Sequence, residues 1–507
     1  MKTDDVLERL HSIDRECRHL AHAVAVLEWD QETYLPLKGV EDRSEQLALL
    51  EGIVHERATD PEVGRLLTEL GSDTKNPSGD ENLPPVERDF LKVLRRDYDR
   101  EVLLPKEFVS EAARAQGLSQ AAWVQARKNN DFKAFVPHLK TMVDLCRRQA
   151  AYWGFSGDAV YDALLDLYEP GMTAKDIALL FTPLRDRLSV LLKKIAARPA
   201  GDGDFLDRDY DIHQQEQYNL ALMDALGFPR DRGRLDITAH PFTTTLGFDD
   251  VRITTRYAAD DLLSTIFSTI HESGHAFYEL NIDPKLRGTS LANGVSMGIH
   301  ESQSRLWENI IGRSRPFWEC QFPRLKEFFP EQLASVSADD FYRAANRVRP
   351  SLIRTEADEV SYSLHVILRF ELEQRLFSGA LAVEDLPGAW RQSMKDLLGV
   401  EPQTDAEGVL QDVHWSQGSF GYFPSYALGN LYGLQFRQKL RQDLPDLDTA
   451  ISHGNFQGIH TWLRENIHQW GRRLDPADLL NQVTGEKLSI APFLAYIEGK
   501  YTELYGL

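Results

Sequence analysis

Cysteine is scarce in this sequence. Cys17, Cys146 and Cys320 are the only three among 507 residues, they lie far apart, and none belongs to a CxxC pair. This distribution excludes a disulfide framework and a thiolate metal site. We expect three free thiols in a reducing compartment, which predicts a cytoplasmic protein.

Positive charge and long apolar runs are also lacking. The 57 Lys and Arg residues are outnumbered by 78 Asp and Glu residues, and the formal net charge is -21. This charge repels phosphate backbones and anionic lipid surfaces, which excludes nucleic acid as a partner. The first ten residues, MKTDDVLERL, hold no apolar signal core, and no stretch approaches the roughly 18 consecutive apolar residues of a membrane helix. We therefore expect neither export nor membrane attachment.

What the sequence does contain is helical periodicity. Apolar residues at alternating steps of four and three run from Val6 to Leu27 and would share one face of a long helix. Pro- and Gly-rich segments mark loops, and none of them forces a division into domains. The sequence predicts a mainly α-helical protein with residues 1–507 as a single domain. Similar apolar spacing recurs at 86–103, 138–153, 173–197, 356–378 and 427–442.

One segment departs from this pattern. Residues 237–257, ITAHPFTTTLGFDDVRITTRY, are rich in Thr, Val, Ile and aromatics and are interrupted by Gly247 and two aspartates. Such a composition favours strands joined by a turn. We expect a small β-hairpin here.

A short histidine motif follows the hairpin directly. Residues 260–282 have a helical pattern, with two aspartates placed to serve its N-terminus, and contain His271, Glu272 and His275. Histidines four residues apart project from one helix face, so both imidazoles can reach one metal ion. Glu272 then lies beside that ion as the general base that activates water. The alternative is that all three are ordinary helix residues.

A catalytic zinc site needs a third protein ligand. The next helical pattern, at 293–316, carries Glu301 near its start, with His300 as the rival ligand. Adjacent residues on a helix diverge by about 100°, so only one of the two can face the metal. We favour Glu301, which completes the two-His-one-Glu plan of thermolysin-like zinc peptidases.

Further motifs make the chain resemble the carboxypeptidase Taq family of metallocarboxypeptidases. In order along the chain, they are His240-Pro241-Phe242, DVRIT at 250–254, HESQ at 300–303, IRTEAD at 353–358 and GVLQDVHW at 408–415. Family-like text extends from WDQETYLP at 29–36 to GSFGYFPSYALGNLYG at 418–433, so the resemblance spans nearly the whole chain.

The resemblance implies a large helical zincin body with a deep groove closed at one end and the active-site core at about 237–430. It implies zinc-dependent release of single amino acids from peptide C-termini with broad specificity, in a homodimer. Cobalt is an alternative metal, since a His-His-Glu site accepts several divalent ions. A zinc oligopeptidase or dipeptidyl carboxypeptidase of related fold is the alternative enzyme. The alternative outside enzymes is a catalytically silent metal-binding or peptide-binding scaffold.

An exopeptidase must recognise a free carboxylate, for which a guanidinium is best suited. Within the family motifs, Arg354 is the expected main anchor, and its alternative role is an ion pair with Asp358. Arg252 is the second candidate, with a structural pair to Asp250 as its alternative. His240 is placed to line the substrate pocket, or else to serve as a cap or core residue.

Two more residues are candidates for stabilising the oxyanion. His414 can hydrogen-bond the substrate or the intermediate if Gln411 or Asp412 orients it, or it can support other residues instead. Tyr422 can donate its phenolic hydrogen, or it can be one of the aromatic core residues of a packed loop.

Overall fold

The computed structural model describes residues 2–198 and 203–507, and most of them are helical. The prediction of a mainly α-helical protein is confirmed. The helices of the N-terminal part are α1 (Thr3–Thr33), α2 (Val40–Ala58), α3 (Pro61–Glu69), α4 (Pro85–Val102), α5 (Lys106–Asn129), α6 (Phe132–Tyr152), α7 (Val160–Leu165), α8 (Ala174–Ala196) and α9 (Ile212–Leu226).

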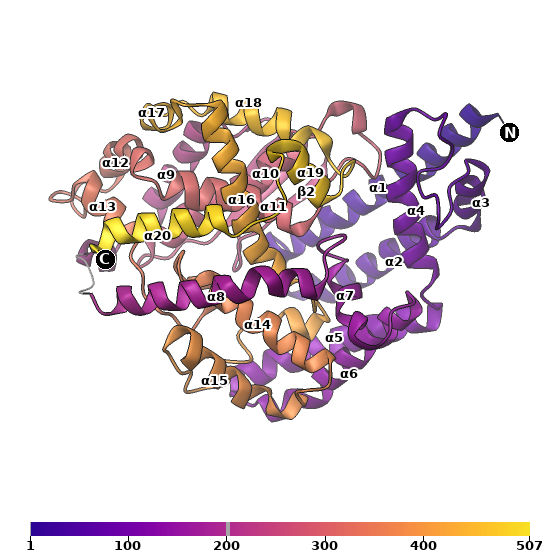
Figure 1. Ribbon diagram of the computed structural model, residues 1–507, viewed down its shortest axis with the longest axis horizontal. Helices are drawn as coiled ribbons and strands as arrows, with labels where there is room; N and C mark the ends of the chain where they lie inside the picture. Colours follow the sequence, from indigo (N-terminus) through magenta and orange to yellow (C-terminus); the bar gives the residue numbers. More distant parts are fainter. Residues whose placement is uncertain (1, 199–202) are drawn as a thin grey trace.

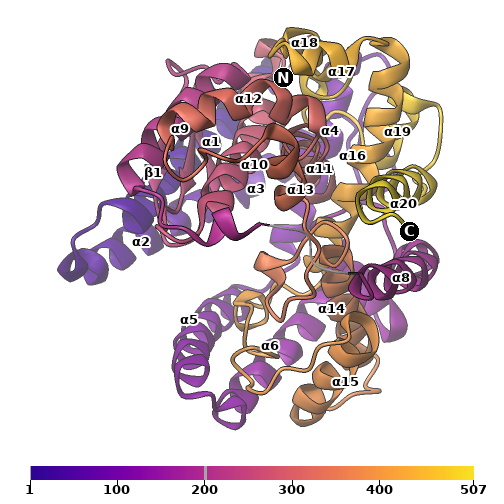
Figure 2. The same ribbon diagram turned by 90° about the vertical axis from the view of Figure 1, so that its left-hand side faces the viewer.

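The remaining helices follow the only sheet of the described residues. They are α10 (Leu262–Leu280), α11 (Met297–Arg305), α12 (Arg315–Phe328), α13 (Ala338–Ala345), α14 (Tyr362–Phe377), α15 (Leu386–Leu398), α16 (Phe423–Asp443), α17 (Leu447–Ser452), α18 (Gln457–Asn466), α19 (Pro476–Thr484) and α20 (Ala491–Tyr505). In Figures 1 and 2, α10, α11 and α16 lie centrally and the other helices of this part surround them. In the described part of the chain, no helix combines the length and hydrophobicity that crossing a membrane requires.

Two predicted helices begin later or end earlier than expected. The pattern at 356–378 becomes a helix only from Tyr362, because the Asp358 carboxylate accepts hydrogen bonds from the backbone N–H groups of Val360 and Ser361 and holds a turn there. The pattern at 293–316 divides into α11, a π-helix at Leu306–Gly312 and the start of α12. Short π-helices are frequent at functional sites, and this one adjoins α11.

The sheet contains the predicted hairpin and one additional strand. Strands β2 (Thr243–Gly247) and β3 (Asp250–Thr255) pair antiparallel, while β1 (Gly233–Ile237) pairs parallel with β3 on its other side. The order β1-β3-β2 leaves β2 at an edge. Strand β1 was missed because GRLDI is too short to show an alternating pattern.

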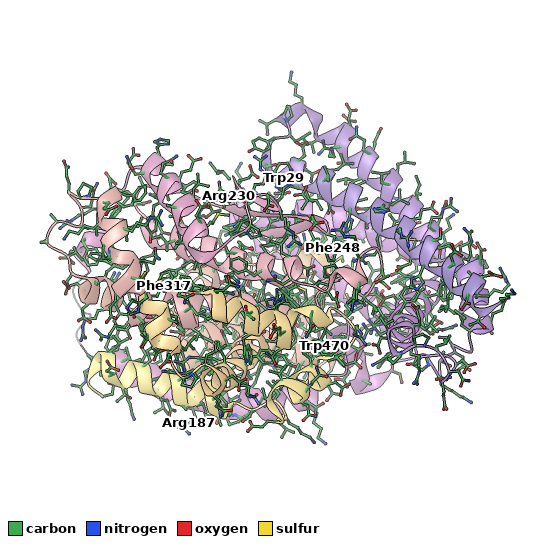
Figure 3. The ribbon with its side chains drawn as sticks, turned by 90° about the horizontal axis from the view of Figure 1, so that it is seen from above. Trp29, Arg187, Arg230, Phe248, Phe317 and Trp470 are labelled. Atoms are coloured by element: carbon green, nitrogen blue, oxygen red, sulfur yellow. The ribbon has the colours of Figure 1, made fainter. Side chains whose placement is uncertain are left out.

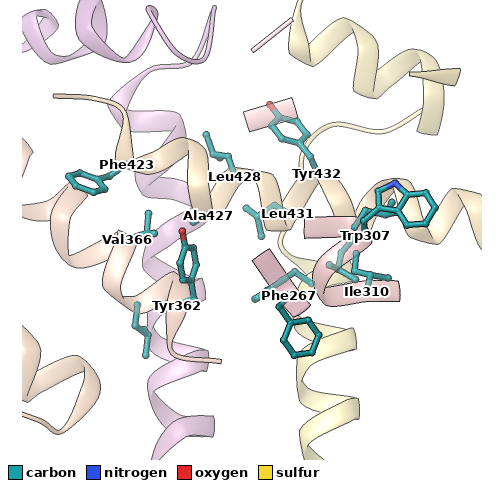
Figure 4. Close-up of a cluster of buried hydrophobic side chains, with 14 of the residues drawn as sticks. Phe267, Trp307, Ile310, Tyr362, Val366, Phe423, Ala427, Leu428, Leu431 and Tyr432 are labelled. Carbon is teal, nitrogen blue, oxygen red and sulfur yellow. The ribbon is translucent and has the colours of Figure 1, made fainter. Parts of the chain in front are cut away.

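Buried apolar side chains form two clusters. The smaller one joins α1, α3 and α4 to residues 282–291, and the larger one fills the rest of the body. In Figure 4, α16 crosses the larger cluster, with Tyr362 and Val366 of α14 near one end and Trp307 and Ile310 of the π-helix near the other. The candidate site therefore lies on helices that are packed on several sides.

Candidate metal centre

Helix α10 carries the histidine motif and is fixed at its start. The Asp261 carboxylate caps it by accepting a hydrogen bond from the Ser264 N–H at 3.0 Å. Most of the helix is buried, including Glu272. His271, Glu272 and His275 thus lie among buried apolar side chains such as Ile270 and Phe277.

Three donor atoms from α10 and α11 meet at one point. The Glu301 Oε2 lies 3.6 Å from His271 Nε2 and 3.4 Å from His275 Nε2. One ligand atom from each of these residues lies within 4.8 Å of the others, a spacing that one metal ion can span. The histidine side chains are 17% and 14% exposed and the glutamate 6%, so the site is recessed but reachable.

Glycines on α10 and α16 allow these two helices to approach α11, which carries Glu301, very closely. A Cβ at Gly274 would lie 2.7 Å from the Ser304 Cα on α11. A Cβ at Gly429 of α16 would lie 2.5 Å from the Glu301 Cγ. Contacts this short do not occur in proteins, so only glycine allows α10 and α16 to press α11 from both sides. The carboxylate of Glu301 is thereby held against the two imidazoles.

The outer nitrogen of each histidine has its own partner. His271 Nδ1 lies 2.8 Å from Glu308 Oε2, on the π-helix. His275 Nδ1 lies 2.6 Å from His300 Nδ1, and His300 Nε2 lies 2.9 Å from Glu279 Oε1. If Glu279 accepts from His300, then His300 Nδ1 can accept from His275, which leaves both Nε2 lone pairs directed at the metal position. His300, the rival ligand from the sequence, thus sits behind His275.

Charges around the carboxylates differ between the two glutamates. Burial raises the pKa of Glu301, but Arg305, whose Nε donates to Oε1 at 2.7 Å, and His271 hold that pKa well below its usual range. Burial also raises the pKa of Glu272, and here the opposing effects of His271 and Thr243 are smaller. The Thr243 hydroxyl of edge strand β2 donates to Glu272 Oε2 at 2.6 Å. The Glu301 carboxyl is therefore held in its ionised form, whereas the pKa of Glu272 lies above its usual value.

Arg354 lies in a buried network. Its Nε and Nη2 donate to Asp412 Oδ1 at 3.1 and 2.9 Å, and its Nη1 donates to the Tyr362 hydroxyl at 3.2 Å. The other oxygen of Asp412 accepts from Arg369 Nε at 2.7 Å. The alternative pairing of Arg354 with Asp358 is wrong, because Asp358 accepts from backbone N–H groups instead.

Arg252 and His240 lie on the sheet side of the site. Arg252 makes a bidentate pair with Asp250 at 2.9 and 2.8 Å, which is the structural pairing given as its alternative role. Its guanidinium carbon also lies 4.4 Å from the centroid of Trp29, a residue labelled in Figure 3. His240 is exposed in the loop between β1 and β2.

His414 and Tyr422 join an aromatic cluster at the start of α16. His414 Nε2 lies 3.2 Å from the Tyr426 hydroxyl, and Tyr422 packs edge-on against Tyr426 with ring centroids 5.2 Å apart. The expectation that Gln411 or Asp412 orients His414 is wrong, since these two side chains bind arginines. Burial lowers the pKa of His414 to about 4 and raises that of Tyr422. Both side chains are therefore neutral hydrogen-bonding groups near pH 7.

Sequence reasoning missed several of these partners. Thr243, Glu279, Glu308 and Tyr426 come from four different elements, and their roles depend on how those elements pack. Two of them had a local signal: Tyr426 follows Tyr422 by four residues, and Glu279 follows His275 by four residues on α10, so each shares a helix face with its predecessor. For Thr243 and Glu308, the sequence held no spacing that relates them to the histidine motif.

The helical fold and the two-His-one-Glu cluster define a metallopeptidase. The chain belongs to the family described as Carboxypeptidase Taq (M32) metallopeptidase, whose sequence profile matches residues 9–501. It is therefore a metallocarboxypeptidase, a peptide hydrolase that depends on a divalent metal.

Individual relatives are similar over their full lengths. Thermostable carboxypeptidase 1 of Thermus thermophilus is 44% identical, with 100% of each chain covered. Carboxypeptidase 1 of Bacillus subtilis is 41% identical, with 96% of each covered. The crystal structure of the M32 carboxypeptidase from Deinococcus radiodurans R1 superimposes with a TM-score of 0.95 at 41% identity, covering 99% of this chain and 100% of that one.

Proposed function

We propose that this metallocarboxypeptidase is zinc-dependent and releases single amino acids in sequence from peptide C-termini, with broad specificity. His271, His275 and Glu301 would hold the metal, and Glu272 would act as the general base. The observation that carries the proposal is the convergence of the three donor atoms within 4.8 Å, with Glu272 next to them on α10.

The donor set suits zinc well. Two imidazoles and one carboxylate are a common catalytic zinc set, and each imidazole has an outer partner that fixes its orientation. Cobalt is the alternative metal, because this donor set discriminates weakly among divalent ions. When bound, the ion would polarise the scissile carbonyl and lower the pKa of water.

Glu272 would move the proton. Its raised pKa makes the carboxylate a better base than an exposed glutamate, and Thr243 holds one of its oxygens in place. Glu272 takes a proton from the attacking water and passes it to the leaving amine. Edge strand β2, which carries Thr243, has no second strand partner among the described residues, and an extended peptide would pair with its outer side.

Arg354 would bind the terminal carboxylate in a groove closed at one end. Hydrogen bonds to Asp412 and Tyr362 fix the orientation of its guanidinium, so the buried side chain would present a rigid binding group. Arg252 and His240 are the further candidates for substrate contact. Arg252 is paired with Asp250 as Arg354 is with Asp412, but it lies on the sheet, and His240 is exposed in the loop before β2.

His414 and Tyr422 would supply hydrogen bonds to the oxyanion. Both are buried and neutral, and Tyr426 joins them into one cluster at the start of α16. A donor preorganised in a site with little water stabilises developing charge more than water does.

We also propose that the chain acts as one domain and assembles as a cytoplasmic homodimer. Helix α2, which extends from the body in Figure 2, supports the dimer: Arg43 is its one buried residue, while Leu49 is 66% and Val40 47% exposed. Light scattering of the unmodified protein and of Leu49→Asp tests this surface. A Leu49→Asp protein that remains dimeric would contradict it.

The alternative enzyme is an oligopeptidase or dipeptidyl carboxypeptidase. A timed product assay on a peptide of six to ten residues separates the two, since single amino acids should appear in order from the C-terminus. Dipeptides or internal fragments as first products would overturn the proposal. Against a silent scaffold, Glu272→Gln should abolish hydrolysis while zinc stays bound.

A further inference from the structure

A cavity of about 350 Å³ lies apart from the metal centre. It is lined by residues of α4, of the turn after α6 and of α7, by Asp475 before α19, and by Thr74 and Pro77 of the loop before α4. Helix α4 belongs to the smaller apolar cluster, whereas α6 and α7 belong to the larger one. The cavity therefore sits at the seam between the two cores, a typical place for ligand pockets.

Three cations on α4 and three acids around the cavity neutralise one another. Arg95 donates to Asp99 at 2.8 Å. Lys92 bonds to Asp475 at 2.5 Å, and Arg100 bonds to Asp166. These pairs leave no net charge on the walls they form.

Arg96 is the one cation lining the cavity that makes no hydrogen-bonded ion pair in the described structure. Its nearest carboxylates are Asp475 Oδ1 at 3.8 Å from Nη1 and Asp97 Oδ1 at 3.9 Å from Nε, both beyond hydrogen-bonding distance. Lys92 and Arg472 already bind those two acids. Among the described residues, Arg96 Nε is buried without any hydrogen-bond partner. The Arg96 side chain as a whole is 27% exposed and lines the cavity, so the terminal nitrogens of its guanidinium can pair with an anion there.

Apolar side chains form the remaining walls. Val93 and Ala163 are buried, while Leu103 is 50% and Phe155 37% exposed. Trp153 is fixed by a hydrogen bond from its Nε1 to the Arg100 carbonyl at 3.1 Å. A ligand that fills the cavity must therefore combine one anionic group with an apolar body.

We propose that this cavity is a binding site for a small monocarboxylate with an apolar or aromatic body. The carboxylate pairs with the Arg96 guanidinium, and the body packs on Trp153 and Phe155. One uncompensated cation matches one negative charge. A phosphate or nucleotide would bring further negative charge against Asp99, Asp166 and Asp475, which disfavours it.

The test is calorimetric titration of the zinc-loaded protein with indole-3-propionate. The proposed function predicts that Arg354 also binds carboxylates, so the unmodified protein should bind two molecules per chain. Arg96→Gln should weaken one site by about tenfold or more, since it removes a charged hydrogen bond. Arg354→Gln should weaken the other site. If the only site in the unmodified protein disappears with Arg354→Gln and is unchanged by Arg96→Gln, the cavity proposal is overturned.

Controls make each result decisive. Arg88→Gln removes another α4 arginine whose Nε is buried and unpartnered in the described structure but which does not line the cavity, so both sites should persist. Phe155→Ala, at a partly exposed wall, should weaken the cavity site about fivefold through lost apolar contact. Tryptamine, with an ammonium in place of the carboxylate, should not bind, and inorganic phosphate should not compete. Binding of tryptamine equal to that of indole-3-propionate, or no response to either cavity variant, would refute the proposal.

Discussion

Gly429→Ala should weaken metal binding through steric pressure on Glu301. The added Cβ would lie 2.5 Å from the Glu301 Cγ, 2.7 Å from its Cβ and 3.0 Å from its carbonyl carbon. Position 429 is buried in α16, so the methyl group cannot turn to solvent. Either α16 moves away from α11 or Glu301 moves relative to His271 and His275.

The size of the effect follows from the cost of overpacking. Adding a methyl group to a packed core typically costs about 1–3 kcal/mol. If displacement of Glu301 absorbs this cost, metal affinity falls by about 5- to 150-fold. Competition between the protein and a chromophoric chelator for zinc measures this affinity directly, without substrate.

Gly433→Ala, one turn later on α16, is the matched control. Its Cβ would lie 3.1 Å from the Ser302 carbonyl oxygen, which is tight but does not involve the glutamate side chain. Both substitutions gain the same helix propensity, so their difference isolates the contact with Glu301. Equal zinc affinities for the two variants would refute the reasoning.

Three further predictions concern individual side chains. Glu279→Gln should lower zinc affinity by about 10- to 100-fold, because it removes the acceptor behind His300, and chelator competition measures the loss. Thr243→Val should lower kcat while zinc affinity is retained, because it frees the Glu272 carboxylate, and steady-state kinetics with a zinc titration separates these effects. Burial raises the pKa of Glu169 from 4.5 to about 7, so its carboxyl keeps its proton in the folded state while it would lose it in the unfolded state. As pH rises from 4.5 to 7, the free energy of unfolding of the unmodified protein should therefore fall by up to roughly 3 kcal/mol relative to that of Glu169→Gln. Urea unfolding of both proteins across that pH range measures the difference.

The sequence predicts those parts of the fold that have local causes. Helices with a clear apolar face were located well: the periodicity from Val6 to Leu27 lies within α1, and 173–197 nearly matches α8. Errors occur where a side chain or a neighbour overrides the pattern. Asp358 holds a turn where the pattern at 356–378 predicted helix, and β1 forms because β3 provides its partner.

The same distinction applies to the site. His271 and His275 lie four residues apart on one helix, so their spacing alone predicts their common face, with Glu272 beside them. Their association with Glu301 was inferred from the next helix, whereas the pairing of Glu308 with His271 depends on a π-helix that no sequence pattern indicated. Gly274 and Gly429 carried no visible signal, because the need for a glycine appears only when the neighbouring backbone is known.

The most direct test of the account is hydrolysis of an N-blocked dipeptide and of the same compound with its C-terminus amidated. Each is incubated with the protein after chelator treatment and again after zinc or cobalt is restored. The account predicts metal-dependent release of the terminal amino acid from the free acid alone, because Arg354 is proposed to bind the carboxylate. Equal cleavage of the amide, or cleavage that persists in chelator, would contradict it.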